Sequence, residues 1–260
     1  MLRVMTYNIR DGGVGGDVGD RLPLIHELVR SASPDVLAIQ EANYFEAGGD
    51  RRLLAFEAAT GLRGFLGRSP SGYHGVLFVR PDRRPTTVRS DDAAGNRSRV
   101  ELICPGPDGR RLTIVAVHLD PVSPETRLVG TLNALGTPPA ILMGDLNNCR
   151  ADDPRAEDLL ARLPPRQRAR AGTDRLDDRL FAALEQAGYV DLFRRLHPGE
   201  PGHTFPRPGL RLDYVFATED LASRAVSCDV VRTPPADVAS DHYPLMADID
   251  IALGPAEGSS

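Results

Sequence analysis

The sequence predicts an α/β fold in which two β-sheets pack against each other and helices flank them. Short apolar runs typical of strands alternate with amphipathic stretches typical of helices along the whole chain. Some strands are joined by short turns and others are separated by helices, which indicates both antiparallel and crossover connections. Polar candidate residues occur in both halves, and no repeat of solenoid period is visible, so we expect one domain over residues 1–252.

The first part of the chain predicts two strands and two helices. Residues 2–9 alternate in polarity and predict a strand, which the glycine-rich loop 12–19 follows. Residues 20–31 predict a helix with Asp20 as its cap and one apolar face. Residues 35–41 form an apolar run that ends in two polar residues, and residues 50–60 are helical in pattern.

The middle of the chain is rich in predicted strands. They cover residues 75–80, 85–89, 99–104 and 111–118. The turn Pro107-Asp108-Gly109 joins the last two as a hairpin. A helix over residues 124–135 and an apolar strand over residues 140–144 follow.

The third part begins with a segment of a different character. Residues 150–179 are dense in Arg, Asp and Glu and are broken by three prolines, so we expect a solvated, mobile insertion. A helix over residues 176–186 and three strands follow, at residues 212–217, 225–231 and 242–251. Residues 253–260 are small and polar and predict a disordered tail.

Composition limits the possible partners. The formal charge of −5 argues against a protein that coats nucleic acid, and all 31 basic residues are Arg, so a single Arg is a weak signal. The three cysteines are scattered, which indicates neither a disulfide framework nor a zinc site. Because the sequence shows no leader pattern and no bilayer-spanning stretch, we expect a cytoplasmic protein without membrane contact, with a monomer favoured.

Eight polar residues stand at the ends of strand-like runs spread over the whole chain. They are Asn8, Glu41, His118, Asp145, Asn147, Asp213, Asp241 and His242. Carboxylate and amide oxygens suit Mg²⁺ or Mn²⁺, and histidines can move protons near neutral pH. This combination favours a metal-assisted hydrolase of phosphate esters.

Five short motifs that contain these residues resemble, in order and spacing, those of the endonuclease/exonuclease/phosphatase superfamily, the deoxyribonuclease-I-like hydrolases. The motifs are Thr6-Tyr7-Asn8, Ile39-Gln40-Glu41, Gly144-Asp145-Leu146-Asn147, Arg211-Leu212-Asp213 and Ser240-Asp241-His242. The resemblance spans about residues 2–251. It implies a four-layer sandwich of two mixed sheets between helices.

The resemblance also implies a metal site and an acid–base set. Glu41 would be the main Mg²⁺ ligand, helped by Asp241, while Asn8 would orient the metal shell or the phosphate. The roles that the resemblance implies for the other residues concern the water, the phosphate and the leaving group. Asp145 would position the attacking water, Asn147 would bind a phosphate oxygen, Asp213 would orient His242 toward the phosphate, and His118 would protonate the leaving oxygen. An Asx-turn is the structural alternative for Asp145 and Asn147.

Two positions, Arg10 and His74, bear on the branch of the superfamily. Arg10 stands where the abasic-site branch has a second metal-binding aspartate, so we expect one tight metal ion. Arg10 and Arg99 are candidate phosphate donors, although a plain surface role is equally open for each. His74 lies near the place where the deoxyribonuclease I branch carries a glutamate partner for the leaving-group histidine, which leaves the tuning of His118 open.

Three functions therefore remain. The first is a phosphodiesterase acting on nucleic acid or a nucleotide-like diester. The second is a phosphatase or phosphodiesterase for a small metabolite, lipid headgroup or sugar phosphate. The third, a catalytically inactive binding scaffold, is disfavoured because every expected metal, base and acid position holds a competent residue.

Overall fold

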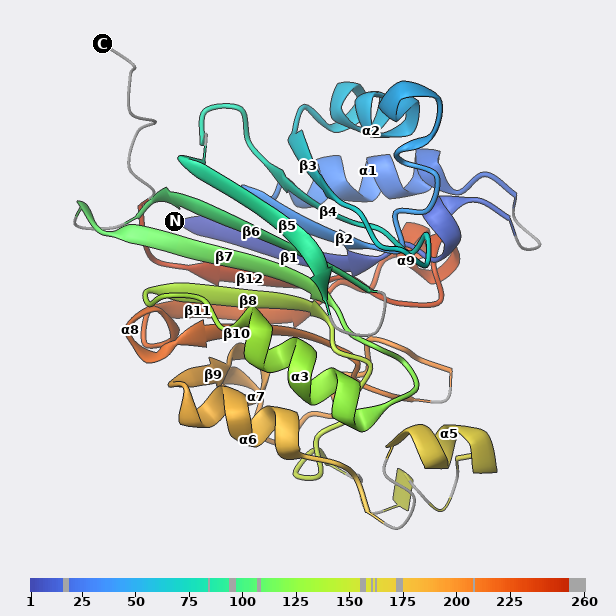
Figure 1. The fold of residues 1–260 in the computed structure, drawn as a ribbon, viewed down its shortest axis with the longest axis vertical. Coiled ribbons are helices and arrows are strands. Elements are labelled where there is room, and N and C mark those ends of the chain that lie inside the picture. The colour runs from blue at the N-terminus through green and yellow to red at the C-terminus, as the bar shows by residue number, and fades with distance from the viewer. Residues whose placement is uncertain are drawn as a thin grey trace.

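The protein contains two six-stranded mixed β-sheets that pack face to face between helices (Figure 1). A computed structural model describes residues 1–15, 19–83, 85–93, 97–106, 109–154, 158–159, 161, 163–171, 175–207 and 209–252. The predicted four-layer α/β sandwich is confirmed. The expected tail at residues 253–260 and the turn residues 107 and 108 lie outside the described residues.

The first sheet is built around two parallel strands. Its order is β11 (Ala225–Val230), β12 (Leu245–Ile249), β1 (Leu2–Asn8), β2 (Val36–Gln40), β4 (Gly75–Val79) and β3 (Arg63–Gly67). β1 and β2 are parallel, and the other neighbours are antiparallel.

The second sheet repeats this scheme. Its order is β5 (Thr87–Ala93), β6 (Arg97–Pro105), β7 (Arg111–His118), β8 (Ala140–Asp145), β10 (Asp213–Thr218) and β9 (Tyr189–Asp191). β7 and β8 are parallel, and the predicted hairpin of β6 and β7 pairs Pro105 with Arg111.

Helices cover the outer face of each sheet (Figure 1). The first sheet packs against α1 (Leu22–Ala32), α2 (Ala47–Thr60) and α9 (Pro234–Ala239), and the second against α3 (Pro124–Ala134) and α6 (Arg179–Gln186). The short helices α7 (Leu192–Leu196) and α8 (Glu219–Ala222) insert apolar side chains into the core between the sheets. Among the described residues, no helix has the length and apolar character needed to cross a bilayer.

The core between the sheets follows from side-chain alternation along each strand. In β1, Leu2 and Val4 face the other sheet, whereas Met5 and Tyr7 face the helices. Ile114 and Ala116 in β7, like their counterparts in β2, β8 and β10, continue this inner layer. Because the period of a strand is two residues, the next inner position along each of these strands is also directed between the sheets.

Several short elements were not predicted from the sequence. They are β3, β9, α7, α8, α9 and α5 (Pro165–Ala171). β3 contains two glycines, which weaken a strand pattern, but a Cβ at Gly64 would lie 2.6 Å from Leu53 of α2 and from Phe78 of β4. The glycines there permit close packing at the edge of the sheet.

Two expectations about the later part of the chain were wrong. The strand predicted from residue 242 begins at Leu245, because the turn before Pro244 places His242 outside the sheet. The insertion is not simply solvated: Leu159, Leu163 and Leu176 are buried with Cys149 and other apolar residues in a separate cluster. These few leucines are separated by many charged residues, so the segment shows no apolar periodicity in the sequence.

Gly144→Ala should lower the free energy of unfolding by about 3 kcal/mol or more. Gly144 has φ of +147°, and an added Cβ would lie 1.9 Å from the carbonyl oxygen of Val117 in β7. Gly199→Ala is the matched control, because no atom lies within 4 Å of its added Cβ. Urea denaturation checks both variants, and equal stability of the two would contradict this account of Gly144.

Candidate active site

The predicted site residues converge where the inner faces of the two sheets end. Asn8, His118 and Asp145 occupy the last inner positions of β1, β7 and β8, and Asp213 occupies the first inner position of the antiparallel strand β10. His118 and Asp213 are both register partners of Asp145, one on each side of β8. The alternation that builds the core therefore also assembles these polar groups.

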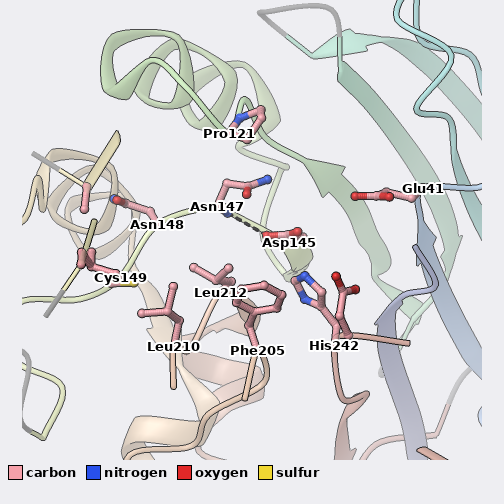
Figure 2. A pocket seen from close by; sticks show the side chains of 13 residues that line it. Glu41, Pro121, Asp145, Asn147, Asn148, Cys149, Phe205, Leu210, Leu212 and His242 are labelled. Atoms are coloured by element: carbon pink, nitrogen blue, oxygen red, sulfur yellow. Dashed lines mark hydrogen bonds between the residues drawn. The ribbon is translucent and has the colours of Figure 1, made fainter. Parts of the chain in front are cut away.

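A cleft of about 280 Å³ opens at this end of the sandwich. Its polar side carries Glu41, Asp145, Asp241 and His242, and Figure 2 shows Glu41, Asp145 and His242 directed into one space. Asn147 also lines the cleft. Segments separated by most of the chain length thus share one concave site.

Asn8 connects two carboxylates. Its Nδ2 donates to Asp145 Oδ2 at 2.9 Å and to Glu41 Oε1 at 3.3 Å. Its Oδ1 accepts from the backbone N–H of Arg10 at 3.0 Å, which fixes the orientation of the amide. In this orientation Asn8 presents a donor rather than an oxygen to Glu41, so the metal-ligand role expected for it would require the amide to turn over.

Glu41 is held by an unusual backbone conformation. It has φ of 56°, and Arg10 and Asp11 in the facing loop also have positive φ. The backbone N–H of Asp11 donates to Glu41 Oε2 at 3.0 Å. Left-handed conformations at non-glycine residues are costly and concentrate at functional sites. The strained loop fixes the Glu41 carboxylate, which is half-buried at the cleft.

Asp145 and Asn147 form an Asx-turn, which is the structural alternative that the sequence left open for them. Asn147 has φ of 49°, and its backbone N–H donates to Asp145 Oδ1 at 2.8 Å. Its Nδ2 donates to the Leu119 carbonyl at 3.0 Å. A dashed line in Figure 2 marks the hydrogen bond of this Asx-turn, and both residues line the cleft. Burial, and then the neighbouring Asp213, raise the pKa of Asp145 above its usual range.

His242 and Asp213 form a buried pair. His242 Nδ1 lies 2.8 Å from Asp213 Oδ2, and Asp213 is 0% exposed. Burial opposes charge on the imidazole, but the attraction of the Asp213 carboxylate outweighs it and raises the pKa of His242 to about 10. His242 is therefore a cation at neutral pH, and its Nε2 has no hydrogen-bond partner within the described parts of the chain.

The carboxylate beside His118, that of Asp145, is too far away for a hydrogen bond that would hold a second proton on the ring. His118 is 2% exposed, its Nε2 lies 3.8 Å from Asp145 Oδ2, and its buried Nδ1 has no partner among the described residues. Burial, reinforced by the charge of Arg97, holds the pKa of His118 well below its usual range. The imidazole is therefore neutral and can offer one N–H as a donor.

His74 supports a loop instead of tuning His118. Its Nδ1 accepts from the Ser69 N–H at 2.9 Å, and its Nε2 lies 3.1 Å from a carboxylate oxygen of Glu46. The neighbouring Tyr73 ring lies edge-on to the His118 ring with centroids 6.5 Å apart, and the Arg97 guanidinium covers Tyr73 at 4.4 Å. Tyr73 and Arg97 are neighbours of the site that the sequence analysis did not identify.

The two candidate phosphate-binding arginines lie in different surroundings. The half-exposed Arg10 lies beside the cleft, with Nε 3.7 Å from Asp241 Oδ2. Arg99 donates to Asp91 Oδ2 at 2.7 Å and also binds Glu101. Because these carboxylates occupy its guanidinium, the substrate-binding role expected for Arg99 is not supported by its contacts.

Two further residues that the sequence analysis left without a role hold the site together. Ser240 Oγ donates to the Asn8 carbonyl at 2.7 Å and accepts from the His242 N–H at 3.3 Å. Thr204 Oγ1 accepts from the Asp213 N–H at 3.1 Å, and its carbonyl accepts from Tyr243. Ser240 belongs to a quoted motif, but no sequence pattern distinguishes Thr204.

The opposite wall of the cleft is apolar. Figure 2 shows Cys149, Phe205, Leu210 and Leu212 on this side, facing the carboxylates. Leu163 and Ala171 of the insertion complete the wall. The Phe205 ring packs against His242 with centroids 4.8 Å apart. The insertion thus contributes directly to the surface that a substrate would contact.

The donor set at the cleft fits a hard divalent cation. Four carboxylates (Glu41, Asp145, Asp213 and Asp241) gather around one buried cation, His242, which leaves excess negative charge. Oxygens of Asp145 and Asp213 lie within 4.8 Å of a His242 nitrogen, but a protonated imidazole cannot ligate a metal. Glu41 and Asp241 are therefore the better placed candidates to hold a metal ion.

Comparison with known proteins agrees with this architecture. The chain is 27% identical to the uncharacterized protein YbhP of Escherichia coli K12 over 273 aligned positions, which cover 96% of each protein. An AP endonuclease from Archaeoglobus fulgidus has the same fold with a TM-score of 0.68 and 21% identity, covering 96% of this chain and 100% of that one. A mannosyl-6-phosphatase from Bacteroides thetaiotaomicron has a TM-score of 0.67 and 16% identity, covering 97% and 100%. Residues 5–242 match the model of the endonuclease/exonuclease/phosphatase family, and the chain belongs to that family.

Proposed function

We propose that the protein is a Mg²⁺- or Mn²⁺-dependent hydrolase that cleaves phosphodiesters of nucleic acid or nucleotide-like compounds by attack of water. One observation carries this proposal: a carboxylate-rich cleft also contains a buried imidazolium, His242, paired with Asp213 at 2.8 Å. Bound metal and imidazolium together suit a substrate whose oxygens gain negative charge during reaction. Membership of the family supports the same chemistry.

The carboxylates of the cleft serve the metal ion and the attacking water. A divalent cation held by Glu41 and Asp241 would neutralise charge on the phosphate oxygens. Asp145, kept in place by Asn8 and the Asn147 N–H, orients the attacking water and accepts its proton. Its raised pKa makes it a stronger base than an ordinary carboxylate.

Two histidines and an asparagine act on the other oxygens. His242 offers its free Nε2–H to a non-bridging phosphate oxygen, and Asp213 keeps the ring charged. We propose that His118 assists the leaving oxygen as a neutral N–H donor, because burial holds its pKa well below the usual range and Asp145 Oδ2, at 3.8 Å, is too distant for a hydrogen bond to Nε2. Asn147 contributes a side-chain amide at the cleft that can contact the phosphate.

A small-molecule phosphatase or phosphodiesterase is the second candidate. The lining of the cleft favours it, since half of its wall is apolar and no arginine is among the described lining residues. The fold itself serves both classes, because the structural relatives include proteins described as an AP endonuclease and a mannosyl-6-phosphatase.

The purified protein should hydrolyse bis-p-nitrophenyl phosphate with Mg²⁺ or Mn²⁺ and lose this activity in EDTA. Release of p-nitrophenol measures the rate, and p-nitrophenyl phosphate is the matched monoester. A clear preference for the monoester would favour the small-molecule phosphatase. No turnover of either ester with any divalent metal would contradict the proposed function and favour a binding scaffold.

Glu41→Gln should raise the metal concentration needed for half-maximal turnover by about 100-fold or more, because a neutral amide replaces an anionic ligand. A Mn²⁺ titration monitored by electron paramagnetic resonance measures affinity independently of activity. Glu27→Gln, at an exposed position of α1, is the control and should behave as wild type. Unchanged Mn²⁺ affinity in Glu41→Gln would remove Glu41 from the proposed ligand set.

Asp213→Asn should lower the rate by about 10²–10³ and shift the titration of His242 to lower pH. In the wild type the pair contributes stability that is complete below pH 6.5, the ordinary pKa of histidine, and is lost as pH rises through about 10. The stability difference between wild type and variant should therefore shrink across that range.

Nuclear magnetic resonance of the ring nitrogens gives the pKa of His242 directly, and urea denaturation at several pH values gives the stability difference. The conservative change to Asn avoids leaving a buried carboxylate without its cation, which His242→Ala would do at a cost of about 3–5 kcal/mol. If His242 titrates at the same pH in both proteins, Asp213 does not maintain its charge.

A further inference from the structure

A second groove adjoins the active-site cleft and differs from it in charge. It has a volume of about 570 Å³, and three arginines line it: Arg10, Arg21 and Arg207. Phe205 and Asp241 line both the groove and the cleft, so the two spaces are neighbours. A molecule that fills the cleft can therefore extend into the groove.

Arg21 is a buried cation without a carboxylate. It is 4% exposed, and no described carboxylate lies within ion-pair distance of it. Nη1 donates to the carbonyls of Ile9 and Ala239, at 3.0 and 2.7 Å, and Nη2 donates to those of Arg10 and Val14, at 2.6 and 3.3 Å. Nε is buried with no partner among the described residues. Carbonyl dipoles only partly compensate this charge, so an anion in the groove would be stabilised.

The other charges of the groove leave it positive. Arg10 has only distant partners, Asp11 at 3.9 Å and Asp241 at 3.7 Å, and Arg207 forms no ion pair within the described residues. The remaining lining carboxylate, Asp237, accepts from the Tyr243 hydroxyl at 2.7 Å. The lining of the groove therefore contains three arginines and two carboxylates. One of these carboxylates, Asp241, also lines the active-site cleft.

We propose that this groove binds a second phosphate group of the substrate, next to the ester that is cleaved. The inference rests on the proposed function of the cleft. Guanidinium groups bind phosphate through paired, charge-assisted hydrogen bonds, and Arg10 and Arg207 have donors free for such contacts. The cleft requires a metal ion to accept an anion, whereas the groove does not. The substrate class is therefore an ester with two phosphates, either a nucleotide chain or a bisphosphorylated metabolite.

Calorimetric titration with Ca²⁺ in place of Mg²⁺ tests the second site, because a metal ion lets the cleft accept one phosphate while the groove takes the other. Thymidine 3′,5′-bisphosphate is compared with thymidine 5′-monophosphate, and fructose 1,6-bisphosphate with fructose 6-phosphate. We expect at least one bisphosphate to bind about 10-fold more tightly than its monophosphate. The pair that shows the preference identifies the nucleotide or the sugar as the source of the second phosphate.

Arg207→Ala should reduce this preference to less than about twofold, because it removes an exposed donor of the groove. Arg111→Ala is the matched control: Arg111 is exposed at the start of β7, while His118 ends that strand at the cleft. The control should retain the full preference.

Equal binding of monophosphates and bisphosphates by the wild type, or an unchanged preference in Arg207→Ala, would overturn the second site. Turnover of bis-p-nitrophenyl phosphate does not involve the groove and separates the two proposals. A wild type that hydrolyses this diester but shows no preference retains the proposed function and loses the second site. A preference without any turnover would leave an anion groove beside a cleft of another function.

Discussion

The site depends on how charge is compensated at the end of the inter-sheet core. Asp213 is fully buried, and His242 is the cation that compensates it at 2.8 Å. Without that cation a buried carboxylate would be costly, so the loop that carries His242 must stay against β10. The Ser240 hydroxyl ties this loop to the Asn8 carbonyl at the end of β1, and Thr204 ties it to β10 by accepting from the backbone N–H groups of Tyr243 and Asp213. Both the stability of the fold and the proposed function therefore require this loop to hold His242 against Asp213.

The same alternation of side chains produces the core and the site. The inner positions of β7 and β8 are apolar up to the last one, which His118 and Asp145 occupy, and Asn8 and Asp213 stand at the same ends of β1 and β10. A shift of register by one residue would move these groups to the helix-covered faces. Gly144 protects this register at β8, since only glycine allows its backbone to approach Val117 so closely. The register and packing of the strands thus fix the relative positions of the site residues.

Sequence patterns predict the elements that have strong periodicity and miss those fixed by tertiary contacts. The central strands follow from apolar runs that end in polar residues, whereas a common site for Glu41 and Asp145 is implied by the order and spacing of the five motifs. The left-handed conformation of Asn147 follows from neither, because it depends on hydrogen bonds to Asp145 and Leu119. Glycine-rich β3 and the leucines of the insertion also lacked a local signal. Their positions are set by packing against residues distant in sequence.

An arginine in this chain is informative only through its partners. Since every basic residue except histidine is Arg, the residue type alone distinguishes nothing. Arg211 is 0% exposed at its side chain but is bound by Asp153 and Asp191, and Arg99 is bound by Asp91 and Glu101, so both are structural ion pairs. Arg21 is equally inaccessible and has only carbonyl partners among the described residues. This difference in compensation, rather than the number of arginines, is why the groove beside the cleft favours an anion.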